Sequence, residues 1–190
     1  MARDLHAGFA DPGRAAPGDL AWFLEQADRL PGVQAIQRAL RRAIDPRPGL
    51  RILDAGCGIG LETSRLAEMY PDLHVTGLDR NGELLEIGRR RATSPNLTWL
   101  QADLTDLDLP DTSFDVVRTE RVLMYLAGDA FERVIDRLIR LLGPEGRLVL
   151  FELDYGATIL PPGSATDTVV ERIHTALEAS LNCEVQIVTV

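Results

Sequence analysis

The central motif of this chain is Arg51-Ile52-Leu53-Asp54-Ala55-Gly56-Cys57-Gly58-Ile59-Gly60. Its first half is a short apolar run, which predicts a buried strand, and its second half carries three alternating glycines, which let a ligand approach the backbone closely. A helix is predicted over residues 61–70, and a second strand over 73–78 ends at Asp79. Together these segments have the layout of a nucleoside-binding βαβ unit.

The spacing of the glycines discriminates between nucleoside cofactors. In a dinucleotide fingerprint the third glycine follows the second after three positions, whereas Gly56, Gly58 and Gly60 are each two positions apart. Asp79 stands 19 residues beyond Gly60, where a carboxylate accepts hydrogen bonds from both ribose hydroxyls. Asp54 adds a negative charge that repels a pyrophosphate and favours a cationic ligand. S-adenosylmethionine (SAM), with its sulfonium and amino group, therefore fits this motif better than NAD.

Further motifs make the chain similar to the class I SAM-dependent methyltransferases, in particular the small-molecule and quinone type. The resemblance covers about residues 31–181. It includes the segment 100–104, where the family places an acid near the adenine amino group and an apolar residue against the ring. It also includes the strand 114–118 and the turn 142–148, in which Glu145 replaces a glycine. With the residues above, it implies these cofactor contacts: Asp54, Gly56, Gly58, Gly60, Asp79, Arg80, Asp103, Leu104 and Glu120.

Strands and helices alternate along the sequence, which predicts one α/β domain with a Rossmann-like, doubly wound, mostly parallel sheet and helices on both faces. Residues 1–18 are rich in Ala, Gly, Asp and Pro and are expected to be flexible, with order beginning near Asp19. The single SAM-binding domain is expected over 19–190, divided into a helical lid at 19–48 and a Rossmann-like core at 49–190.

The expected reaction is an SN2 methyl transfer from the sulfonium to an oxygen, nitrogen or carbon atom of a small molecule, to which the protein contributes alignment and exclusion of water. The segment 120–126 resembles the small-molecule methyltransferases, so Glu120 is the candidate for the methionine end of SAM. No catalytic base is required or identified. Tyr125, Glu152 and His174 are the candidates for substrate contact or proton removal.

Composition narrows the range of partners. The 190 residues carry a formal net charge of -9, which argues against a nucleic-acid-binding surface. No apolar run approaches the ~20 residues that span a bilayer, so we expect a cytoplasmic protein without a membrane segment. The histidines and cysteines lack ligand spacing, so no metal site is expected.

The last residues depart from the family pattern. Family members usually continue into an antiparallel pair of strands that closes the sheet, whereas the segment 184–190 provides for one strand, so the C-terminal strands are expected to be incomplete. We expect this last strand to pair with a strand of a second chain, in a homodimer or by exchange of the segment, because an uncovered strand edge favours such pairing. Two alternatives stay open: a SAM-binding but catalytically impaired protein, truncated or regulatory, and a nucleotide-dependent oxidoreductase, which the glycine spacing disfavours.

Overall fold

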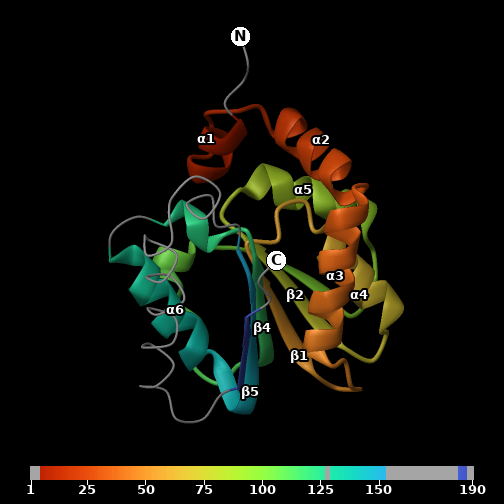
Figure 1. Cartoon of the computed structure of the whole chain (residues 1–190), viewed down its shortest axis with the longest axis vertical. Coiled ribbons are helices and arrows are strands. Elements are labelled where there is room, and N and C mark those ends of the chain that lie inside the picture. Colours follow the sequence, from red (N-terminus) through yellow and green to blue (C-terminus); the bar gives the residue numbers. More distant parts are fainter. Residues whose placement is uncertain (1–4, 127–128, 153–183, 188–190) are drawn as a thin grey trace, which may run out of the picture.

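A computed structural model describes residues 5–126, 129–152 and 184–187 as a parallel sheet with helices on both faces (Figure 1). The strand order is β3-β2-β1-β4-β5-β6, and each neighbouring pair is parallel. The Rossmann-like fold is therefore confirmed. The strands are β1 (Arg51–Ala55), β2 (His74–Asp79), β3 (Leu97–Gln101), β4 (Phe114–Glu120), β5 (Leu142–Phe151) and β6 (Glu184–Ile187).

The central strands carry consecutive buried apolar residues because both faces of the sheet are covered. Ile52 belongs to a core with residues of two helices on one face, and the adjacent Leu53 belongs to a core with residues of α6 on the other. In Figure 1, α3 and α4 lie on one side of the strands and α6 on the other. The helices are α1 (Leu5–Ala10), α2 (Pro17–Asp28), α3 (Pro31–Ile44), α4 (Leu61–Met69), α5 (Gly82–Arg91) and α6 (Ala130–Arg140), with single 3-10 turns η1 (Leu104–Asp106) and η2 (Leu123–Tyr125).

The N-terminal segment is more ordered than its composition suggested. Residues 5–10, expected to be flexible, form α1, and α2 begins at Pro17 rather than near Asp19. The ring of Phe9 lies 6.0 Å from that of Phe23 and 6.2 Å from that of Tyr125, between ring centroids. One aromatic side chain thus attaches α1 both to α2 and to the turn after β4.

Two local features near α6 and β5 differ from simple sequence patterns. Asp129 and Glu132 have the spacing of a capping box, but the Asp129 side chain makes no cap hydrogen bond and pairs with Arg133 instead. The segment 142–148, expected to form a turn, lies within β5, where Glu145 has a left-handed backbone with φ of 62°. This backbone conformation favours glycine.

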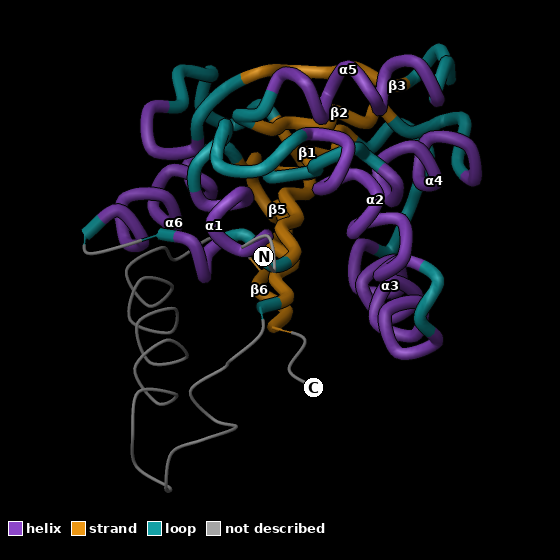
Figure 2. Tube along the Cα trace, turned by 90° about the horizontal axis from the view of Figure 1, so that it is seen from above, coloured by secondary structure: helices purple, strands orange, loops and turns teal. Residues whose placement is uncertain are grey.

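The C-terminal strand also differs in direction from the family pattern. β6 runs parallel to β5, with Arg147 opposite Glu184 and Leu150 opposite Ile187. Figure 2 shows it beside β5 at the end of the sheet opposite to β3. Parallel pairing requires a long crossover connection, and residues 153–183, which separate the two strands, lie outside the described residues.

Candidate cofactor site

The glycine loop between β1 and α4 has a conformation that other residues rarely adopt. Gly56, Gly58 and Gly60 have φ of 79°, 59° and 66°. A Cβ atom at Gly56 would overlap the side chain of Val122, and one at Gly60 would overlap the ring of Trp99. The glycines are therefore required both by backbone conformation and by close packing.

Asp79, at the end of β2, holds this loop in place. Its Oδ2 accepts the backbone N–H of Gly58 at 2.8 Å, and its Oδ1 accepts the N–H of Asn81, also at 2.8 Å. Burial raises the pKa of Asp79, while these two hydrogen bonds oppose the change. Each carboxylate oxygen keeps a further lone pair, so the side chain can still accept two ribose hydroxyls.

A cavity of about 440 Å³ opens over the strand tips, a size within the usual range of small-molecule sites. It brings together most of the residues singled out in the sequence. Among the predicted cofactor contacts, Gly60 is the exception, since it does not line the cavity and stands at the N-cap of α4. The predicted residues that line it are Asp54, Gly56, Gly58, Asp79, Arg80, Asp103, Leu104, Glu120 and Tyr125.

Arg80 and Asp103 form one side of this cavity. Asp103 accepts the backbone N–H and the hydroxyl of Thr105 at 2.9 and 2.7 Å. Partial burial raises the pKa of Asp103, but these hydrogen bonds outweigh it and lower the pKa below its ordinary value. Arg80 lies 3.9 Å from this carboxylate and donates to the carbonyls of Phe9 and Ala10, which attaches the end of α1 to the site.

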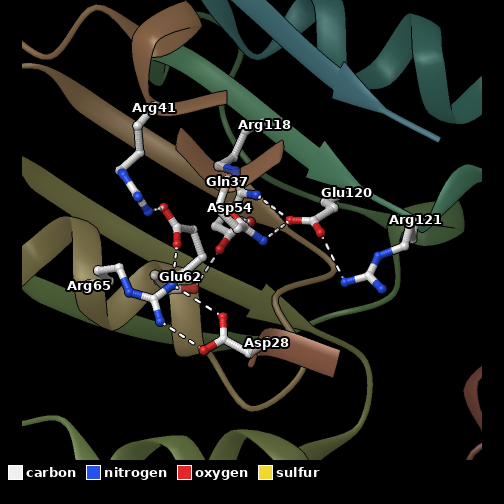
Figure 3. A network of polar contacts seen from close by, with 10 residues as sticks. Asp28, Gln37, Arg41, Asp54, Glu62, Arg65, Arg118, Glu120 and Arg121 are labelled. Atoms are coloured by element: carbon white, nitrogen blue, oxygen red, sulfur yellow. Dashed lines mark hydrogen bonds and ion pairs between the residues drawn. The ribbon is translucent and has the colours of Figure 1, made fainter. Parts of the chain in front are cut away.

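Arg118 lies at the centre of a buried ion network that the sequence did not reveal (Figure 3). Its side chain is 2% exposed and donates to Asp54 and Glu120, at 2.9 Å in each case. Burial alone would lower the pKa of Arg118, but the two carboxylates raise it above its ordinary value. Asp54 also accepts the hydroxyl of Thr63. Asp54 thus lines the cavity as expected, but its negative charge is shared with Arg118.

The network continues into the helices of the N-terminal part. Glu62 of α4 accepts hydrogen bonds from Arg65 at 2.6 Å and from Arg41 of α3, and Arg65 also pairs with Asp28 of α2 at 2.9 Å. Gln37 of α3 donates to Glu120. The network has no net charge, because its four carboxylates are matched by four arginines. The carboxylates are Asp28, Asp54, Glu62 and Glu120, and the arginines are Arg41, Arg65, Arg118 and Arg121.

The structure gives Glu152 a different role from the predicted one. Its carboxylate accepts the backbone N–H groups of Val122, Leu123 and Met124 at 3.0, 3.0 and 3.2 Å, and it does not line the cavity. Burial raises the pKa of Glu152, against the effect of these hydrogen bonds. Glu152 thus holds η2, which carries Tyr125. The third candidate, His174, lies outside the described residues.

Metal-site clusters and membrane-spanning helices are both absent from the described part of the chain. No cluster of three or more histidine, cysteine, aspartate or glutamate side chains there has the arrangement of a metal site. Within the same residues, no helix has both the length and the apolar character needed to cross a bilayer.

The fold and the loop define a Rossmann-like protein with a nucleoside site, and comparison with known proteins identifies the family. Residues 52–146, which make up half of the chain, match the family described as "Methyltransferase domain". The chain belongs to this family.

Three known proteins illustrate the relationship. A 37.1 kDa protein of transposon TN4556 from Streptomyces fradiae is 32% identical over 183 residues, covering 92% of this chain and 51% of the relative. The demethylmenaquinone methyltransferase of Thermus thermophilus is 33% identical, covering 77% and 66%. A TehB-like SAM-dependent methyltransferase from Corynebacterium glutamicum has a TM-score of 0.61 at 25% identity, covering 82% and 83%. The chain spans about half the length of the first curated relatives.

SAM is the cofactor that this family membership indicates, and the residues of the cavity fit it. The backbone of Gly56 and Gly58 lines the cavity directly, Asp79 keeps lone pairs for ribose hydroxyls, and Asp103 and Leu104 line the same cavity. Near the network, Oε1 of Gln37 is a buried acceptor without a partner in the structure. All these groups face one cavity.

Proposed function

We propose that this chain transfers the methyl group of SAM to a small apolar acceptor. The observation that carries the proposal is the contact of Asp79 with the glycine loop. The Asp79 carboxylate accepts the backbone N–H groups of Gly58 and Asn81 and keeps further lone pairs that can accept the ribose hydroxyls. A dinucleotide enzyme is disfavoured because Gly56, Gly58 and Gly60 are each two positions apart, whereas the third glycine of a dinucleotide fingerprint follows after three.

The protein contributes mainly position and desolvation to such a reaction. SAM supplies a methyl group that is already activated on a sulfonium. The loop backbone and Asp79 would hold the nucleoside, Leu104 would contact its base, and the helices α1 and α2, which contribute residues to the cavity, would exclude water. Alignment of the acceptor with the methyl group then provides the main rate enhancement.

The acceptor is proposed to be apolar because of the aromatic residues beside the loop. Phe9, Phe23 and Tyr125 form a contiguous group, and Met124 and Leu126 line the same cavity. Aromatic and methionine side chains favour flat or hydrocarbon-rich ligands. The relationship to a demethylmenaquinone methyltransferase supports an acceptor of this kind.

A methyl-transfer assay tests the proposal. The protein is incubated with methyl-labelled SAM and a panel that contains a naphthoquinol, a long-chain fatty acid and phosphoethanolamine. We expect label on an apolar member and none on phosphoethanolamine. Label on phosphoethanolamine alone would contradict the apolar acceptor, and SAM binding without turnover on any member would favour the catalytically impaired alternative.

We also propose that β6 mediates homodimerisation. β6 lies at the edge of the described sheet, where its outer backbone groups are available to a strand of a second copy. Light scattering at high protein concentration tests this. A mass of twice the chain supports the dimer, and a strictly monomeric mass contradicts it.

A further inference from the structure

Gln37 is a buried polar residue of α3 that none of the cofactor motifs includes. It is 5% exposed and lines the cavity. Its amide Nε2 donates to Glu120, while its Oε1 is buried and has no hydrogen-bond partner among the described residues. The contact with Glu120 fixes the orientation of the amide, because a carboxylate only accepts hydrogen bonds and the Nε2 group must face it.

The free acceptor lies beside a second one. Glu120 Oε2 accepts from both Gln37 and Arg118, whereas Oε1 accepts only from Arg121, at 2.9 Å. Figure 3 shows Gln37, Glu120 and Asp54 close together on the same side of the strands. A buried acceptor without a donor is costly, so this part of the cavity is suited to a ligand group that donates several hydrogen bonds.

A primary ammonium has this chemistry, since it carries three donors and no acceptor. We propose that Oε1 of Gln37 and Oε1 of Glu120 together bind the ammonium of the methionine part of SAM. Gln37 is then a specificity residue that recognises the amino-acid half of the cofactor. The assignment rests on the proposed SAM-dependent function and extends it to the N-terminal helix α3.

Hydrogen-bond geometry, rather than net charge, favours an ammonium at this point. Glu120 is shared between Arg118 and Arg121, so its charge is already compensated and Coulomb attraction alone does not hold a cation there. A neutral amide oxygen adds a directional acceptor without adding charge. The two acceptors, Oε1 of Gln37 and Oε1 of Glu120, therefore select a group that donates several hydrogen bonds. Because the network carries no net charge, it does not repel the carboxylate that accompanies the ammonium in SAM.

Calorimetry on the full chain tests the proposal with two probes. S-adenosylhomocysteine carries the amino-acid half, and 5′-methylthioadenosine lacks it. We expect Gln37→Met to weaken binding of S-adenosylhomocysteine about tenfold to a hundredfold, as for loss of a hydrogen bond to a charged group, and to leave binding of methylthioadenosine unchanged. Gln34→Met on the same helix, at an exposed position, is the matched control and should change neither affinity.

The outcomes separate this assignment from the proposed function. Equal affinity of wild type and Gln37→Met for S-adenosylhomocysteine overturns the assignment, as does an equal loss for both probes, which indicates a structural effect. Gln37→Asn keeps both the amide donor and the amide acceptor and should lose less affinity than Gln37→Met, which keeps the assignment testable even if Gln37→Met folds poorly. Failure of wild type to bind S-adenosylhomocysteine at all overturns the proposed function itself, and the assignment with it.

Discussion

Replacement of Arg118 by methionine is the most informative change in the buried ion network. The side chain is 2% exposed and is the partner of both Asp54 and Glu120. In the variant, Glu120 keeps Arg121, whereas Asp54 keeps only the hydroxyl of Thr63. The penalty therefore falls mainly on Asp54, and removal of one partner from a buried pair typically costs about 3 to 5 kcal/mol.

Urea denaturation of four proteins measures this effect: wild type, Arg118→Met, Asp54→Asn and the double variant. For a chain of this size, the same loss of unfolding free energy corresponds, in a parallel thermal scan, to a melting temperature lower by roughly 6 to 20 °C. Because Asp54→Asn removes the unpaired charge, the double variant should be more stable than Arg118→Met, with a coupling energy of about 2 kcal/mol. A loss below about 1 kcal/mol for Arg118→Met, or strictly additive effects, would refute the reasoning.

Three further predictions concern single residues. Glu145→Gly should raise stability by about 1 kcal/mol, since glycine adopts the observed left-handed φ of 62° without strain; an unchanged or lower melting temperature contradicts this. Glu152→Ala should cost about 2 to 3 kcal/mol in urea unfolding, because three backbone N–H groups lose their acceptor, and Glu152→Gln should cost less. Burial raises the pKa of Asp79, so binding of S-adenosylhomocysteine should be full above that raised pKa and weaken as the pH falls through it. The stability of the free protein should change in the opposite sense, falling as the pH rises from the ordinary aspartate value to the raised one, and Asp79→Asn should abolish both pH effects.

The sheet and the glycine loop were predictable because their signals are local. The apolar run before Gly56 determines a strand buried on both faces, and the three glycines mark a loop with positive φ. Asp79 could be placed because it follows directly from the end of the second strand. In each case, sequence spacing translates into position through the regular geometry of strand and helix.

The ion network was not predictable, since its contacts join residues far apart in the sequence. Asp54 and Arg118 meet only because β1 and β4 are neighbours in the sheet, with Asp54 opposite Arg118 in register. Gln37 belongs to the predicted helical lid, but its contact with Glu120 depends on how α3 packs. Likewise, α1 is too short to show a helical period, and Phe9 holds it through tertiary contacts.

Calorimetric titration with S-adenosylhomocysteine, for wild type and Asp79→Ala, tests the central assignment most directly. Asp79 accepts from the glycine loop and is assigned to the ribose, so its loss removes charge-assisted hydrogen bonds. The account predicts one binding site in wild type and an affinity weaker by about 2 to 3 kcal/mol in the variant. Absence of binding to wild type, or an unchanged affinity in Asp79→Ala, would contradict it.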